Sequence, residues 1–213
     1  MTRRKGITAS ELVAQLNANP EWLERRRQQQ EKSDAIERAA RVAEGPLVQA
    51  LNEAGLGWLR SVWDLVNTDE PYSHVLPILI EHLQRDYPAA ILEGIARAMA
   101  VPESRRFWNI LLRLYWQRPD VSGPHNVKWA IGCALAASAT DDVIDDVIAL
   151  VREPRHGEDR AVFLRVLSAS PLPRAQAAFE DAARDPQLMK EARFIKRVSE
   201  RQRRKADRAR RKG

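Results

Sequence analysis

Apolar residues recur at helical spacing through residues 72–188, in runs that are separated by prolines. Pro88, Pro119, Pro154 and Pro186 follow one another at intervals of 31, 35 and 32 residues. An apolar run with three- and four-residue spacing precedes each of them, and a second such run follows each of the first three. Proline suits a helix start or the turn before it, because it lacks an N–H and has a fixed φ. The pattern predicts a repeating pair of helices joined by short turns.

The predicted second helices of the pairs align with one another. They cover residues 91–100, 127–136 and 159–168, and the predicted first helices cover 76–83, 108–115 and 144–151. Three aligned positions of the second helices are apolar in every copy: Ile95, Ile131 and Phe163; Ala98, Ala134 and Val166; Met99, Leu135 and Leu167. These positions are i, i+3 and i+4 on one helical face, so each second helix carries an apolar stripe.

Residues 75–100 contain a leucine- and proline-rich first helix, the turn Asp86-Tyr87-Pro88 and a second helix rich in small residues. This segment resembles HEAT repeats, of the armadillo-like α-solenoid family. The resemblance implies an all-α superhelix of helical hairpins, with about four helix pairs in residues 71–198, a helical cap in residues 1–70 and a basic tail in residues 199–213. The family usually has a basic residue near the start of its second helix. Lys128 and Arg160 match that position and Leu92 does not.

The N-terminal region predicts helices of its own. Thr8 and Glu11 have the spacing of a capping box and predict a short helix through Leu16. A longer, mostly polar helix is expected from Pro20 to Ala43, ending at Gly45-Pro46, and a further helix over residues 46–54. The apolar residues of the helix expected from Pro20 to Ala43 should face inward: Trp22, Leu23, Ile36, Ala39 and Val42. The arginine run at 25–27 reads as a solvated face, with contact to an acidic partner as the alternative.

Trp58 and Trp63 form part of a concentrated apolar patch before the repeats. We expect them to seal the end of the solenoid, since an end repeat must cover its apolar face. Stacking against a ligand is the alternative.

Composition supports an all-α protein of one elongated domain. Of the 213 residues, 44% are hydrophobic and 30% charged. No apolar run approaches the roughly 18 residues that a transmembrane helix needs, and the N-terminus has no apolar signal region. These features predict a cytoplasmic protein without a membrane partner. The alanine and arginine content is typical of a bacterial protein with GC-rich coding. The single cysteine, Cys133, is expected to be buried.

The net charge of +6 is unevenly distributed. From Arg193 to the end there are 11 lysines and arginines against two acids, Glu200 and Asp207, and the rest of the chain has a net charge of −3. A claim of nucleic-acid binding therefore rests on the tail. Its candidate residues are Arg201, Arg203, Arg204, Lys205, Arg208, Arg210, Arg211 and Lys212.

The sequence contains no motif of catalysis or metal binding. A glycine-rich phosphate loop, HExxH and a cysteine pair are absent, and no two histidines have metal-ligand spacing. Among the acids of residues 141–146, Asp141 and Asp142 are expected to oppose the dipole in the first turn of a helix. A cation site there lacks the glycine turn and final glutamate of a calcium loop. We therefore predict a non-catalytic protein without a cofactor or metal.

The resemblance implies that the second helices line a concave surface. The candidate partner-binding residues are the polar and aromatic positions beside the apolar stripe: Glu93, Arg97, Lys128, Trp129, Arg160 and Arg165. An aromatic residue among arginines is typical of interface hot spots. The alternative is that these side chains pair with carboxylates of neighbouring repeats.

Two functions follow as hypotheses. The first is an interaction module that binds a protein or peptide on its concave face. The second is a nucleic-acid-binding protein that uses the basic tail. It includes a DNA-glycosylase-like role, because alkylpurine DNA glycosylases of a related architecture handle lesions with tryptophans and an aspartate. Trp63-Asp64 is the one adjacent tryptophan–aspartate pair in this chain.

Overall fold

The computed structural model describes residues 7–119 and 124–210, with side chains described as far as residue 202. All regular structure in these residues is helical and no strand occurs among them, so the all-α prediction is confirmed. The chain divides into two compact units, Met1–Ala43 and Glu44–Gly213. Each unit is described by itself.

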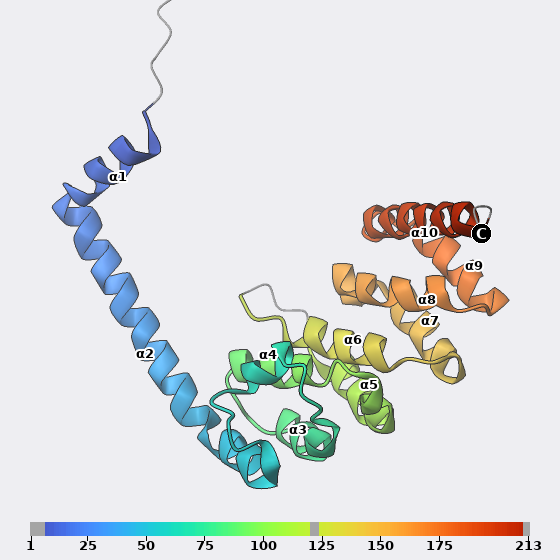
Figure 1. The fold of residues 1–213 in the computed structure, drawn as a ribbon, viewed down its shortest axis with the longest axis horizontal. Helices are drawn as coiled ribbons and strands as arrows, with labels where there is room; N and C mark the ends of the chain where they lie inside the picture. Colours follow the sequence, from blue (N-terminus) through green and yellow to red (C-terminus); the bar gives the residue numbers. More distant parts are fainter. Residues whose placement is uncertain (1–6, 120–123, 211–213) are drawn as a thin grey trace, which may run out of the picture. The chain divides into compact units, whose positions relative to one another are not determined.

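The first unit contains α1 (Ala9–Asn17) and the first part of α2 (Pro20–Leu51) (Figure 1). The predicted capping box is present, since the backbone N–H groups of Thr8 and Glu11 each donate to the other residue's side chain. No side chain of residues 7–43 is buried. The expected inward packing is wrong for Leu23, Ile36, Ala39 and Val42, which are exposed. The described part of this unit therefore has no hydrophobic core of its own.

Helix α2 continues through Gly45 and Pro46, so the prediction that it ends there is wrong. Gly45 has no Cβ to collide with the ring of Pro46, which removes part of the usual restriction on the residue before proline. Leu47 and Leu51, on the following turns, are completely buried. Their packing outweighs the cost of proline inside a helix, about 3 kcal/mol. The helix ends in a π-helical turn over Asn52–Leu56.

Buried Glu44 fixes the start of the second unit. Its Oε1 accepts a hydrogen bond from the N–H of Val62 at 2.6 Å and another from the Ser61 hydroxyl at 3.0 Å. Val62 begins the 3-10 helix η2 (Val62–Asn67), which packs against α4. Gly94 of α4 permits this approach, since a Cβ there would lie 2.6 Å from Val62 Cγ1.

The described residues between 73 and 210 form successive helices. They are α3 (Leu76–Leu83) and α4 (Ala89–Ala98), α5 (Trp108–Gln117) and α6 (Val127–Ser138), α7 (Ile144–Arg152) and α8 (Leu164–Ala169), and α9 (Pro173–Ala182) and α10 (Met189–Arg210). Short 3-10 segments connect several of them: η3 (Ser73–Val75), η4 (Pro102–Phe107), η5 (Asp141–Val143) and η6 (Pro154–Phe163).

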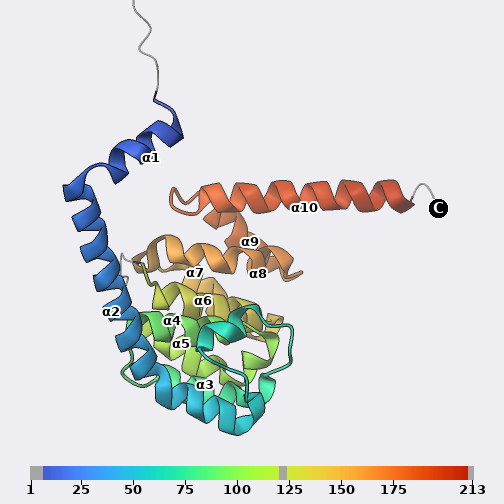
Figure 2. The same ribbon diagram turned by 60° about the vertical axis from the view of Figure 1, so that its left-hand side comes forward.

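Helices that follow one another in the chain pack side by side in the second unit (Figures 1 and 2). Within the pairs, α3 contacts α4, α5 contacts α6, α7 contacts α8 and α9 contacts α10. Between the pairs, α4 contacts α6, α6 contacts η6, α7 contacts α9 and α8 contacts α10. The three expected first helices are confirmed. The apolar stripe is confirmed as buried at eight of its nine positions, Val166 being partly exposed.

The third predicted second helix differs from the structure in its first half. Residues up to Phe163 belong to η6, and α8 starts only at Leu164. Gly157 interrupts regular geometry with φ +53° and ψ −140°, a conformation that favours glycine. The break turns Arg160 into the interior, where it contacts groups far away in the sequence.

The acids of residues 141–146 join neighbouring pairs instead of forming a cluster. Two of them bond to the preceding pair and two to the following segment. The contacts are Asp142 with Arg105 at 2.6 Å, Asp146 with Trp108 Nε1 at 2.8 Å, Asp145 with Arg174 at 2.7 Å, and Asp141 with the Ser170 hydroxyl at 2.6 Å. The hydrogen bond from the Thr140 hydroxyl, followed by the bond from Arg105, lowers the pKa of the Asp142 carboxyl. Each acid thus has a structural partner.

Candidate functional site

Three of the six predicted partner-binding residues lie together. Glu93 and Arg97 occupy successive turns of α4, and Trp129 lies in the first turn of α6, the helix that packs on α4. Trp63 from η2 completes the group with His125, which lies just before α6. We call these five residues the tryptophan–arginine cluster.

Arg97 lies near the rings of both tryptophans. Its Cζ is 4.8 Å from the ring centroid of Trp129 and 5.8 Å from that of Trp63. Both distances are within the range of cation–π attraction, which contributes about 0.5–1 kcal/mol at exposed sites. The side chain of Arg97 remains 35% exposed. A cation close to two indole rings and partly exposed is thus available to a partner.

The buried carboxylate of Glu93 orients the Arg97 side chain. Glu93 is only 6% exposed. Its Oε1 accepts a bond from Arg97 Nε at 3.1 Å, and its Oε2 lies 3.0 Å from His125 Nδ1. Because Nε is engaged, the terminal nitrogens of the guanidinium are the donors left for a ligand. No acceptor for those nitrogens occurs among the described residues.

Asn126 determines where α6 begins and so where Trp129 lies. Its side-chain oxygen accepts a hydrogen bond from the backbone N–H of Trp129 at 2.8 Å, which caps the helix. Its Nδ2 donates to both carboxylate oxygens of Asp159, at 3.0 and 3.1 Å. The cap therefore also connects α6 to η6.

The expectation that Glu93, Lys128 and Arg160 are exposed is wrong, since each is less than 10% exposed. Lys128 Nζ lies 5.4 Å from the ring centroid of Tyr115. Arg160 donates to the carbonyls of Gly157 and Val151. It also contacts Asp185 at 2.9 Å and Gln187 at 2.6 Å. Lys128 and Arg160, the basic residues expected near the start of two of the second helices, thus make internal contacts.

Arg165 is exposed but lies outside the cluster. It faces α10, where its NH2 is 3.9 Å from Glu191 Oε1 and its Cζ is 6.0 Å from the Phe194 ring centroid. It lines a groove of about 500 Å³ between the end of α6 and α8. The exposed residues of the predicted partner-binding surface therefore lie in two separate places, the tryptophan–arginine cluster and the groove beside α8.

Two polar groups near the cluster have structural surroundings. Burial raises the pKa of the Cys133 thiol to about 11, although the positive charge of Arg97 opposes the shift. Little thiolate is then present at neutral pH, which disfavours a nucleophilic role. Asp64, the acid of the tryptophan–aspartate pair, accepts hydrogen bonds from the N–H groups of Arg60 and Ser61 as a helix cap.

A groove adjoins the cluster on the side of Trp63. It measures about 540 Å³ and is lined by Trp58, Arg60, Trp63, Asp64, Asn67 and Thr68. Trp58 is 42% exposed. The prediction that Trp58 helps to seal an apolar end is therefore wrong. The volume is in the range of ligand-binding pockets, about 300–1,000 Å³.

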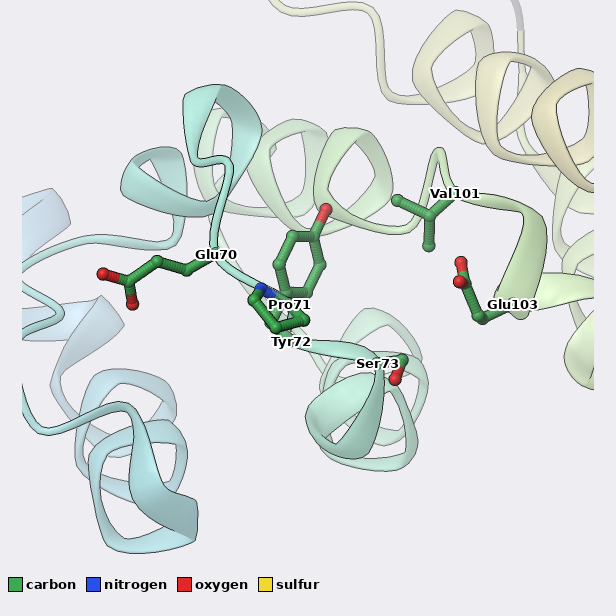
Figure 3. A pocket seen from close by; sticks show the side chains of 6 residues that line it. All are labelled: Glu70, Pro71, Tyr72, Ser73, Val101 and Glu103. Carbon is green, nitrogen blue, oxygen red and sulfur yellow. The ribbon is translucent and has the colours of Figure 1, made fainter.

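A smaller pocket of about 200 Å³ lies beside Tyr72 and is lined in part by Val101 and Glu103 (Figure 3). The Tyr72 hydroxyl donates to the carbonyl of Ala98 at 2.9 Å. Burial, and secondarily the charge of Glu103, raise the pKa of Tyr72. Glu70 points away from these groups in Figure 3. The pocket is below the usual size of a ligand site and presents no convergent chemistry.

The sequence pattern did not indicate that Trp63, His125 and Asn126 lie near Arg97. Asn126 had a usable signal, because asparagine three residues before Trp129 is a favoured helix cap. His125 had none, since its partner Glu93 lies 32 residues earlier. In the tail, Arg201 is exposed on α10. The side chains of Arg203, Arg204, Lys205, Arg208 and Arg210, and the whole of Arg211 and Lys212, lie outside the described part.

Within the described residues, no three or more histidine, cysteine, aspartate or glutamate side chains are placed to hold a metal ion. None of the described helices has both the length and the apolar content that crossing a bilayer requires. Comparison of the chain with protein-family models, with curated proteins and with solved structures finds no match.

Proposed function

We propose that this protein is a non-catalytic interaction module, in which residues 71–198 form a HEAT-like α-solenoid and the helical segments of residues 44–70 cap its first pair. The contacts between consecutive pairs and the packing of η2 on α4 support that arrangement. The partner is a protein or peptide that presents a carboxylate to the tryptophan–arginine cluster.

The proposal rests mainly on Arg97, whose partly exposed guanidinium lies close to the rings of two tryptophans. A guanidinium binds a carboxylate through two parallel hydrogen bonds when its donors are preoriented. Glu93 and the two indoles supply that orientation. Tryptophan and arginine are also the residues most enriched at binding hot spots. The indole faces provide apolar area for the residue beside the carboxylate.

The surroundings favour binding over catalysis. Glu93 is shared by Arg97 and His125 at hydrogen-bond distance. The pKa of Cys133 is raised away from the range in which a thiol is reactive at neutral pH. These groups suit a fixed, charged contact surface.

The test is selection of a random dodecapeptide display library on the full-length protein. We expect enrichment of peptides with Asp or Glu next to an aromatic or aliphatic residue. Trp129→Ala and Arg97→Gln should each weaken an enriched peptide about 30-fold, the equivalent of about 2 kcal/mol at a hot spot. Circular dichroism checks that the variants remain folded.

Trp116→Ala is the matched control, because Trp116 is an exposed tryptophan on α5 that lies outside the cluster and outside the groove beside Trp63. It should leave peptide affinity unchanged. Arg165→Glu tests whether a longer partner reaches the groove beside α8. Equal affinity for wild type and folded Trp129→Ala would overturn the assignment, as would selected peptides without acidic residues.

A further inference from the structure

Helix α10 carries a continuous basic stripe on the side opposite to its packing face. Lys190, Arg193, Arg197 and Arg201 are all exposed. Their spacing of three, four and four residues places them on one side of a helix that turns 100° per residue. The sequence continues this spacing with Arg204 and Arg208, within the helix as far as Arg210. No acidic residue occupies any of these six positions.

The stripe is separate from the residues that hold α10 against the body. Leu188, Ala192 and Ile195 are buried, and α10 contacts α8 and α9. At 100° per residue, the two of these residues that lie within α10, Ala192 and Ile195, are about 100–160° around the helix from Arg193 and Arg197. The basic side is therefore left facing outward by the packing of the helix.

The described part of the stripe borders a groove. This groove measures about 670 Å³ and is lined by Pro186, Met189, Lys190, Arg193, Lys196 and Arg197. Lys196 contacts Glu180 at 2.6 Å. Within the described residues, Lys190, Arg193 and Arg197 have no carboxylate partner. Three uncompensated cations beside a groove, at one helical turn from each other, form a row that complements a row of anions.

We propose that this stripe, Lys190, Arg193, Arg197, Arg201, Arg204 and Arg208, binds the sugar–phosphate backbone of a nucleic acid without sequence preference. At 1.5 Å per residue the 22 residues of α10 extend about 33 Å, the axial length of roughly ten base pairs. The major groove of B-DNA admits an α-helix, whereas that of A-form RNA is too narrow for side chains to enter. Duplex DNA therefore fits the stripe better than duplex RNA.

An anionic membrane fits less well. Membrane-surface helices combine a basic face with large apolar residues on the other face. In the first half of α10, Ile195 is buried, and Phe194 is the large apolar residue that is exposed, near Arg165 of α8. From residue 199 to residue 210 the only apolar residues are Ala206 and Ala209. The second half of the helix thus has charge for a polyanion but no anchor for lipid.

The experiment measures binding of the full-length protein to a labelled 20-base-pair DNA duplex by fluorescence anisotropy over a series of salt concentrations. Six phosphate contacts predict a slope of log K against log salt of about −5. We expect the triple variant K190E/R193E/R197E to bring the slope closer to zero by about 3 units and to weaken the affinity at 100 mM salt at least about 100-fold. R201E/R204E/R208E should do the same.

Two triple variants control for total charge. R203E/K205E/R210E reverses three cations on the same helix that are not members of the stripe, and R25E/R26E/R27E reverses three in the first unit. Both should have clearly smaller effects. If R203E/K205E/R210E equals R201E/R204E/R208E while K190E/R193E/R197E binds like wild type, the tail binds as an unstructured polycation and the stripe is excluded.

Competitors distinguish the polyanion. Duplex RNA of the same sequence should compete several-fold less well than DNA, and equal competition would retain backbone binding but remove the groove argument. Polyglutamate that competes as well as DNA, with the same dependence on the stripe, would overturn the proposal in favour of an acidic protein. Stripe-dependent adsorption to phosphatidylserine vesicles without DNA binding would overturn it in favour of a membrane.

Discussion

Cys133 shows how burial controls chemistry at a single residue. Its thiol lies on α6 one turn after Trp129, close to the charges of Arg97, Asp159 and Glu93. Burial is the largest influence and raises its pKa from 9.0 to about 11. The neutral thiol is thus favoured in the folded protein over a wider pH range than in the unfolded chain.

The raised pKa predicts slow alkylation of the native thiol. At pH 8 the thiolate fraction corresponding to a pKa of about 11 is about one hundredth of that for a pKa of 9.0. Iodoacetamide should therefore react at least about 100-fold more slowly with native protein than with protein unfolded in guanidinium. The native rate should still rise between pH 9 and pH 10, where the unfolded rate levels off. A native plateau below pH 9 would contradict the assignment.

Exposure of individual charged residues was the part of the site that the sequence predicted least well. The positions of Arg97 and Trp129 followed from helical periodicity and from the alignment of α4 with α6. Lys128 and Arg160 occupy equivalent sites beside the stripe, yet both are buried. Arg160 is inside because Asp185 and Gln187, more than 20 residues later, supply acceptors. Local periodicity contains no information on such distant partners.

At the scale of elements, the first helices of the pairs were predicted closely because each combines an apolar face with a nearby proline. Two boundaries failed for identifiable reasons. Gly45 relieves the restriction before Pro46, and buried Leu47 and Leu51 continue α2 beyond it. Gly157 has a positive φ, and residues 159–163, which were predicted to begin a second helix, belong to η6. In both cases glycine conformation and tertiary packing outweighed the proline signal.

Arg160 is expected to hold η6 to the end of α7 and to the segment before α10. Arg160→Met removes four donor contacts and leaves buried acceptors without partners, which should lower the free energy of unfolding by about 2–4 kcal/mol. Arg155→Met is the matched control, because Arg155 lies in the same segment, is 78% exposed and pairs with Glu153 alone. Its effect should stay within about 0.5 kcal/mol.

Urea unfolding followed by circular dichroism measures both variants. Equal losses for Arg160→Met and Arg155→Met would mean that the buried contacts contribute no more than a surface ion pair. A similar loss of stability in Arg160→Lys would indicate that the planar group, with its several donors, is required in addition to the charge.

At the scale of the whole molecule, the two units differ in what stabilises them. Residues 7–43 are helical but contain no buried side chain, so their helices depend on capping, i,i+4 pairs and intrinsic propensity. The second unit has a continuous core that begins with Glu44, Leu47 and Leu51. The sequence predicted the helices of both units, but a boundary inside an uninterrupted helix had no signal in the chain.

This difference predicts that the first unit is dispensable for folding and that the next turns of α2 are not. Deletion of residues 1–43 should change the free energy of unfolding of the remainder by less than about 0.5 kcal/mol, because no buried apolar area is lost. Deletion of residues 1–51 also removes Glu44, Leu47 and Leu51. It leaves the Val62 N–H without its acceptor and exposes the side of the core that the two leucines cover.

The second deletion should therefore cost several kcal/mol, from two leucines at about 2–5 kcal/mol each and one buried hydrogen bond. Urea midpoints and amide hydrogen exchange of η2 and α4 measure both effects. Exchange at Val62 should remain slow after the first deletion and become fast after the second. If deletion of residues 1–43 already destabilises the protein to the same extent, then the first part of α2 contributes to the folded core and the boundary at Glu44 is wrong.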